Sequence, residues 1–194
     1  MTPAEGSLEL QRCGLYLVDS GGQYDFGTTD ITRTVPLGEC SQEEMLDYTL
    51  VLKAHIRCAM AVLPAGSFGI QLDAISRDCL WRARKNFFHG LGHGVGMFLG
   101  VHECPPNVLS RFIDSPMLPG MIFSDEPGIY VQGSHGIRHE NLLLCTQDET
   151  NDYGSFISFE TLTLCHFDTR ASVPGILSSE ETEWLNQYNA TVYN

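Results

Sequence analysis

The sequence has little positive charge and no long apolar run. Only 11 of its 194 residues are Lys or Arg, against 24 Asp and Glu, which gives a formal net charge of −13. So few basic side chains argue against a nucleic-acid-binding protein and against electrostatic docking on anionic lipid. No stretch reaches the roughly 18–20 apolar residues that a membrane span requires. The hydrophobic content of 43% is enough for a packed core, so the composition indicates one globular domain or two small ones.

The cysteines and the first residues favour a cytoplasmic protein. The seven cysteines are scattered, none forms a C-x-x-C pair, and an odd number fits a disulfide scaffold poorly. The opening residues MTPAEGSLELQR show no basic flank followed by an apolar run, so no secretion signal is expected.

Several common catalytic motifs are also missing. The sequence contains no G-x-S-x-G, no phosphate-binding G-x-x-x-x-G-K-[ST] and no H-E-x-x-H. A Cys/His pair is possible from the composition, but no spacing selects one.

Helical and strand patterns are mixed along the chain without regular alternation. The spacing predicts helices over 42–63 and 68–84, and a last helix that begins at Ser178 or Ser179. Ser41 and Glu44 form a capping box for the first helix. Alternating segments predict two hairpins and a further strand: 13–36, 121–145 and 156–165. The order favours an α+β fold with a mainly antiparallel sheet.

Two pairs of carboxylates stand out in the predicted hairpins. A two-residue loop at Tyr24-Asp25 would place Asp19 directly opposite Asp30, and a loop centred on Gly133 would place Glu126 opposite Glu140. Opposed side chains on one face have Cβ atoms about 4.5–5.5 Å apart, so like charges there are unfavourable unless a cation lies between them. The alternative reading, exposed hairpin carboxylates, stays open on this evidence alone.

A Gly/His-rich run lies between these pairs. It contains His89, His93 and His102 among five glycines, which allow the backbone to approach a ligand closely. An imidazole with several carboxylates suits Mn, Fe, Co or Zn better than a thiolate site does. Four carboxylates and one histidine could hold two divalent ions.

These residues, in this order, resemble the metallopeptidases of the pita-bread fold (peptidase family M24), and among them the Xaa-Pro aminopeptidases. The resemblance covers nearly the whole chain and is carried by the segments LYLVDSGGQYDFGTTDITRT, HGLGHGVGMFLGVHE, EPGIY, GIRHEN and FETLTLC. It implies a curved, mainly antiparallel sheet with flanking helices. Family members carry helices and a strand before the first metal-binding Asp, and a further N-terminal domain. Only 18 residues precede Asp19, so residues 1–194 are expected to form an N-terminally truncated part of the catalytic domain.

The resemblance also implies a role for each candidate residue. Asp19 would bind one metal ion, Asp30 and Glu140 would bridge both ions, and His93 and Glu126 would complete the second ion. His102 would contact the substrate and, with Glu126, transfer protons. His89 would line the pocket for the penultimate proline, and Arg138 would hold the ligand carboxylates in place. The ions would be manganese in the first instance, with zinc, cobalt or iron as alternatives.

The implied activity is hydrolysis of the bond between an N-terminal residue and a penultimate proline, with attack by a hydroxide held between the two ions. The expected partners are peptides with proline at position two, without nucleic acid or membrane, and the full-length protein could be a homodimer. Three alternatives stay open: a prolidase-type Xaa-Pro dipeptidase, a metal-binding but inactive fragment, and a non-catalytic protein-interaction module.

Overall fold

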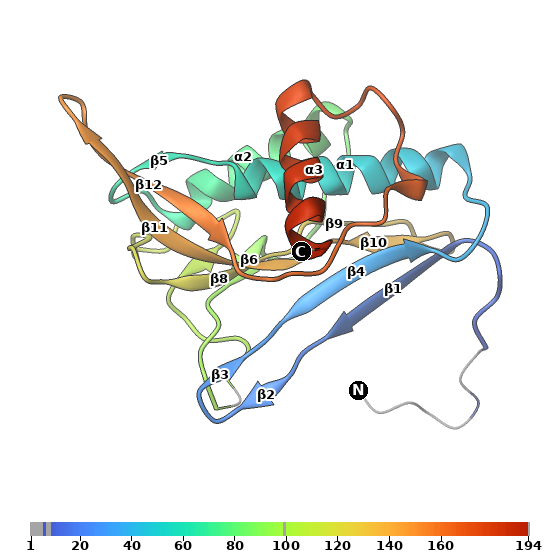
Figure 1. Ribbon diagram of the computed structural model, residues 1–194, viewed down its shortest axis with the longest axis horizontal. Coiled ribbons are helices and arrows are strands. Elements are labelled where there is room, and N and C mark those ends of the chain that lie inside the picture. Colours follow the sequence, from blue (N-terminus) through green and yellow to red (C-terminus); the bar gives the residue numbers. More distant parts are fainter. Residues whose placement is uncertain (1–5, 7–8, 99, 194) are drawn as a thin grey trace.

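The computed structural model describes residue 6, residues 9–98 and residues 100–193 (Figure 1). The helices are α1 (Gln42–Ala59), α2 (Gly69–Arg82), α3 (Ser179–Tyr193) and a short 3₁₀ turn, η1 (Thr169–Ala171). The strands of the first half are β1 (Leu15–Ser20), β2 (Gln23–Tyr24), β3 (Gly27–Thr28), β4 (Ile31–Pro36), β5 (Leu63–Pro64) and β6 (Gly92–His93). The strands of the second half are β7 (Asn107–Val108), β8 (Ile122–Asp125), β9 (Gly128–Tyr130), β10 (Gly136–Arg138), β11 (Asn141–Asn151) and β12 (Gly154–Thr161).

The strands pair in the antiparallel direction throughout the described part of the chain. The largest sheet has the order β5-β12-β11-β8, and the hairpins β1–β4 and β9–β10 extend it in space (Figure 1). The three α-helices lie together on one side of these strands in Figure 1, with α3 crossing in front of α1. The predicted α+β class with a mainly antiparallel sheet is therefore confirmed.

The helix predictions are confirmed, with one boundary moved. The Ser41 hydroxyl accepts from the Glu44 amide at 3.2 Å, and the Glu44 carboxylate accepts from the Ser41 amide at 2.7 Å, which is the predicted capping box. The helix α1 ends at Ala59 rather than near Leu63. Leu63 precedes Pro64, which disfavours helical backbone, and Leu63 instead pairs with Ile157 of β12.

The core forms around α1. The predicted apolar positions Tyr48, Leu52 and Ile56 are all fully buried, and α2 and α3 both pack against this helix. None of the helices in the described residues is long and apolar enough to cross a membrane.

The predicted register of the second hairpin is confirmed. Tyr130 pairs with Gly136 across a turn that contains Gly133, and further along the same path Asp125 pairs with Asn141. Between these two ladders the pairing is interrupted, at 126–127 on one strand and 139–140 on the other. Glu126 and Glu140 lie in this interruption.

The predicted register of the first hairpin is wrong. Asp19 faces Thr32, not Asp30, and the two-residue loop is Asp25-Phe26 because Tyr24 pairs with Gly27. Threonine side chains set this register: Thr28 donates to the Gln23 side chain at 3.0 Å, and Thr29 accepts from the Gly22 amide at 2.8 Å. The shift moves each partner by two positions, so Asp19 and Asp30 still belong to the same face of the hairpin.

A buried arginine fixes the start of the Gly/His-rich segment. Arg77 of α2 is 1% exposed, forms an ion pair with Asp73 at 2.8 Å and donates to the carbonyls of Phe87 (2.6 Å) and His89 (2.7 Å). Its guanidinium also lies 3.5 Å from the centre of the Phe87 ring. These contacts join α2 to the segment that carries the candidate histidines.

We expect Arg77→Lys to lower the free energy of unfolding by about 2 kcal/mol, because an ammonium cannot reach both buried carbonyls while it keeps its pair with Asp73. Urea denaturation followed by circular dichroism measures this. Arg82→Lys, on the same helix but with a side chain that is 79% exposed, is the control and should leave the unfolding midpoint unchanged. Equal midpoints for both variants would contradict the assignment.

Candidate metal centre

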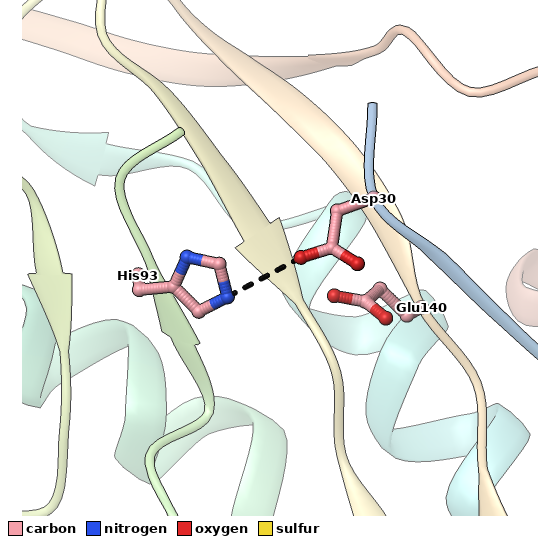
Figure 2. Close-up of side chains that lie close together, drawn as sticks. All are labelled: Asp30, His93 and Glu140. Atoms are coloured by element: carbon pink, nitrogen blue, oxygen red, sulfur yellow. Dashed lines mark ion pairs between the residues drawn. The ribbon is translucent and has the colours of Figure 1, made fainter. Parts of the chain in front are cut away.

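Three candidate ligands from distant parts of the chain converge on one point. Asp30 precedes β4, His93 ends β6 and Glu140 lies between β10 and β11, and one donor atom of each is within 4.8 Å of the others. Figure 2 shows the two carboxylates side by side with the imidazole turned toward them, and His93 Nε2 is 3.5 Å from Asp30 Oδ2. Asp30 is 8% exposed and Glu140 is 2% exposed, so these carboxylates are almost withdrawn from water.

Glu126 joins this group through His93. Its Oε1 atom lies 3.2 Å from His93 Nε2 and accepts a hydrogen bond from the Ser124 hydroxyl at 3.0 Å. Ser124 also accepts from the His93 amide at 3.1 Å, so one hydroxyl orients both candidate ligands.

The amides of Glu126 and Glu140 join the hairpin to the neighbouring segments. The Glu126 amide, which faces away from the partner strand, donates to the Leu91 carbonyl at 2.8 Å. The Glu140 amide donates to the Thr32 carbonyl at 3.0 Å. These outward amides bind the Gly/His-rich segment on one side and β4 on the other.

Asp19 occupies a different position from the other candidates. Its side chain is 48% exposed, and its Oδ2 atom lies 2.6 Å from Arg138 Nη2. It does not belong to the three-residue cluster among the described residues, but its charge contributes to raising the pKa of Asp30. Asp19 is therefore at the edge of the centre, held there by an arginine.

Arg138 organises the surroundings of the carboxylates. It donates to Thr32 Oγ1 at 3.2 Å and to the Tyr130 hydroxyl at 2.9 Å, in addition to its pair with Asp19. Thr32 in turn donates to Glu140 Oε2 at 2.6 Å. Arg138 thus touches Asp19 directly and reaches Glu140 through one hydroxyl.

The other two histidines line a cavity that opens beside His93. The cavity has a volume of about 240 Å³, and its walls include His89, His93, His102 and Glu126. The centres of the His102 and His93 rings are 4.3 Å apart, and the two rings meet edge to face. His89 Nε2 lies 2.9 Å from the Tyr130 hydroxyl, and burial lowers the pKa of His89, so this imidazole is neutral at pH 7.

The sequence reasoning missed Thr32, Ser124 and Tyr130. A signal was available for two of them, because residues two apart on an extended strand share a face: Thr32 follows Asp30, and Ser124 precedes Glu126. Tyr130 had no such signal, because its hydroxyl meets His89 across 41 residues of sequence.

The electrostatics of the centre are those of crowded acids. Burial, together with the charges of Glu126 and Asp30, raises the pKa of Glu140 to about 8. Burial and the charge of Asp19 raise the pKa of Asp30. Burial alone would lower the pKa of His93, but its hydrogen bond to Glu126 and the nearby carboxylates raise it to about 9. Such a set of oxygen donors and one imidazole fits divalent cations, which would replace the protons that now balance the charge.

Two family models match the chain. Residues 2–147 match the model of metallopeptidase family M24, and residues 155–194 match the model of the C-terminal region of peptidase M24. All of the candidate ligands lie in the first of these regions.

Relatives and solved structures point the same way. The chain is 44% identical over 183 residues to a probable Xaa-Pro aminopeptidase P of Fusarium vanettenii, covering 92% of this chain and 30% of the relative. Among solved structures it is 40% identical, with a TM-score of 0.86, to an X-prolyl aminopeptidase from Caenorhabditis elegans, described as a cytosolic enzyme with a di-nuclear active site; 92% of this chain and 29% of that chain are covered. A prolidase from Pyrococcus furiosus is 30% identical with a TM-score of 0.70, covering 81% of this chain and 43% of that one.

The fold expected from the resemblance is confirmed by these structural matches. The chain spans about a third of the length of the curated relatives it matches.

Metal binding should release protons and depend steeply on pH. Glu140 and His93 are both protonated at pH 7 without metal, since their pKa values are about 8 and about 9, and a metal must displace those protons. Apparent affinity for Mn²⁺ should therefore rise with pH up to about 9 and level off above it. Calorimetry in buffers of different ionisation enthalpy counts the protons.

Glu140→Gln is the matched control for this measurement. It keeps the shape of the side chain but carries no titratable group, so its metal binding should release about one proton fewer per protein chain at pH 7. An unchanged proton count, or an affinity that does not vary with pH, would contradict the assignment.

Proposed function

Because the chain belongs to metallopeptidase family M24, we propose that it carries the active site of a peptidase that cleaves between an N-terminal residue and a penultimate proline. The observation that carries this proposal is the convergence of Asp30, His93 and Glu140, joined through His93 by Glu126. His93 and Glu126 also line a cavity whose walls include His89 and His102. The names of the relatives, Xaa-Pro aminopeptidases and prolidases, support the choice of bond.

The proposed metal ligands are those of the sequence analysis: Asp19, Asp30, His93, Glu126 and Glu140. The di-nuclear active site described for the Caenorhabditis elegans relative supports two divalent ions, and the hard oxygen donors support manganese as the metal for assays. When bound, such ions supply an activated water as nucleophile and polarise the scissile carbonyl.

The chain's own residues would bind and orient the substrate and move its protons. The negative charge around Asp19 and Asp30 would attract the free amine of a peptide. The exposed imidazole of His102, next to His93, would contact the peptide and donate a proton to the leaving proline nitrogen. The Glu126 carboxylate would take up the proton lost by the nucleophile, while Arg138 and Thr32 hold the neighbouring ligands.

His89 would form a wall of the pocket for the penultimate proline. Its ring is stacked at a tilt on Phe87, with 4.7 Å between ring centres, and is fixed on the other side by Tyr130. A neutral, immobilised imidazole presents a flat surface that suits a proline ring.

The prolidase-type activity on Xaa-Pro dipeptides is the second candidate, favoured by the match to the Pyrococcus furiosus prolidase. Comparison of an Xaa-Pro-Xaa tripeptide with an Xaa-Pro dipeptide separates the two. Residues 1–194 would form part of one catalytic domain, and the cytosolic description of the nematode relative supports a cytoplasmic location.

The first test is turnover with Mn²⁺ present. Glu140→Gln should reduce release of the first residue from an Xaa-Pro-Xaa peptide by more than about 100-fold, because even partners of metal ligands are worth 10–100-fold. Glu160→Gln, on an exposed position of β12, is the control and should keep full activity. Tightly bound metal without turnover in the unmodified chain would favour the inactive-fragment or interaction-module alternatives.

The second test separates proton transfer from metal binding. His102→Asn should lower kcat/KM by about 10²–10⁴-fold, the usual contribution of a general acid, while metal content stays unchanged. His166→Asn, at another exposed histidine, should change neither quantity. A parallel loss of metal in His102→Asn would show that this imidazole is a ligand instead.

A further inference from the structure

Arg33 of β4 is a buried cation that the proposed mechanism leaves unused. Its residue exposure is 5%, and its partners in the described chain are carbonyl oxygens, an amide and a phenol rather than a carboxylate. A buried guanidinium without a counter-charge is costly, so its hydrogen bonds must be well formed. The identity of those partners indicates what the arginine does.

One side of Arg33 contacts the backbone that carries a proposed ligand. Nη1 donates to the Glu140 carbonyl at 2.6 Å, and Nη2 donates to Asn141 Oδ1 at 2.7 Å. Its sequence neighbour, Thr32, forms the bridge to Glu140 and donates to the Glu140 carboxylate. Successive side chains of a strand point to opposite faces. Thr32 therefore binds the Glu140 carboxylate on the face of the candidate metal centre, and Arg33 binds the Glu140 carbonyl from the opposite face.

The other side of Arg33 contacts the C-terminal region. It donates to the carbonyls of Cys165 (2.5 Å) and His166 (3.3 Å), and its guanidinium lies 4.0 Å from the centre of the Phe167 ring. The Tyr188 hydroxyl, which comes from α3, accepts from Arg33 at 3.1 Å and from the Cys165 amide at 3.2 Å. Arg33 thereby connects α3 to the strand of Glu140.

Asn141 extends the same network to Glu126. Its Nδ2 atom lies 3.2 Å from His55 Nε2, and His55 Nδ1 lies 2.9 Å from Asp125 Oδ2. These three side chains are fully buried. Asp125 immediately precedes Glu126, so the network ends directly behind the second proposed ligand of the hairpin.

We propose that this buried network positions Glu126 and Glu140 for metal binding and makes metal affinity depend on how α3 packs against β4. This inference rests on the proposed metal centre. The network consists of Arg33, Asn141, His55, Asp125 and Tyr188. Arg33 and Tyr188 are positioning residues in this network, since they touch neither the metal ligands' carboxylates nor the cavity.

The test compares metal affinity in two pairs of matched variants. Arg33→Lys keeps the charge but cannot donate to Glu140 and to the C-terminal carbonyls together. Tyr188→Phe removes only the hydroxyl. Their controls are Arg170→Lys, with a side chain that is 71% exposed, and Tyr193→Phe, an exposed position on the same helix as Tyr188. Each purified variant is titrated with Mn²⁺ by calorimetry and with Co²⁺ by visible absorption, at a temperature where circular dichroism shows it fully folded.

We expect Arg33→Lys to weaken metal binding roughly 10-fold and to change the Co²⁺ spectrum, since outer partners of ligands are worth 10–100-fold in affinity. Tyr188→Phe should give a smaller loss in the same direction, and both controls should match the unmodified protein. A purely structural role would lower thermal stability but leave the affinity and spectrum of the folded protein unchanged, and that result would overturn the proposal.

The experiment also separates this inference from the proposed function. If the unmodified chain binds no metal, the proposed metal centre and the proposed role of the network are both wrong. If the unmodified chain binds metal and the variants bind it equally well, only the proposed role of the network is wrong. If the variants lose affinity while no Xaa-Pro peptide is cleaved, the network stands and the peptidase proposal fails.

Discussion

The centre of this structure depends on the repulsion between carboxylates that the fold forces together. Asp30 and Glu140 are nearly buried, and in the described chain neither is paired with a lysine or arginine. Burial raises the pKa of both side chains, and the charge of Asp30 contributes to the rise at Glu140. Two unit charges 4 Å apart repel by about 4 kcal/mol at an effective dielectric constant of 20. Such an arrangement is stable only when protons on the acids or cations between them balance the negative charge. One divalent ion can balance two carboxylates at once.

The geometry that creates this crowding is a strand pair whose amides point outward. Hydrogen-bonded pairs in this hairpin fall at the odd-numbered residues: the Cys145 amide donates to Met121, and the Val131 amide donates to His135. Glu126 and Glu140 therefore occupy a non-hydrogen-bonded position, where the amides face away from the partner strand. These two amides bind the carbonyls of Leu91 and Thr32 and so bring the Gly/His-rich segment and β4 against the hairpin. Gly92 permits the approach, since a Cβ atom there would lie 1.7 Å from the Ser124 carbonyl oxygen. The ligands converge because the backbone that carries them is also the backbone that joins the segments.

The sequence predicts part of this arrangement and not the rest, for identifiable reasons. The opposition of Glu126 and Glu140 is predicted correctly because Gly133 marks a turn midway between them and the register on both sides follows it. The opposition of Asp19 and Asp30 is predicted wrongly because the threonines at 28 and 29 bond across the hairpin and shift its register. A hairpin turn can be recognised in the sequence from a residue such as Gly133. Side-chain hydrogen bonds that shift the register, such as those of Thr28 and Thr29, cannot be recognised in this way. The role of Arg33 could not be identified at all, since its partners other than the Thr32 carbonyl lie 107 to 155 residues away.

The network behind the ligands gives a physical reason for the C-terminal region to belong to the centre although it supplies none of the proposed ligands. The carbonyls at 165 and 166 and the hydroxyl of Tyr188 provide acceptors that a buried arginine requires, and the arginine in turn fixes the backbone of Glu140. Removal of those acceptors would leave a desolvated cation next to the proposed cation site, which is unfavourable for both. In the proposed network, the C-terminal region therefore stabilises the candidate metal centre through the hydrogen bonds of Arg33 as well as through packing on α1.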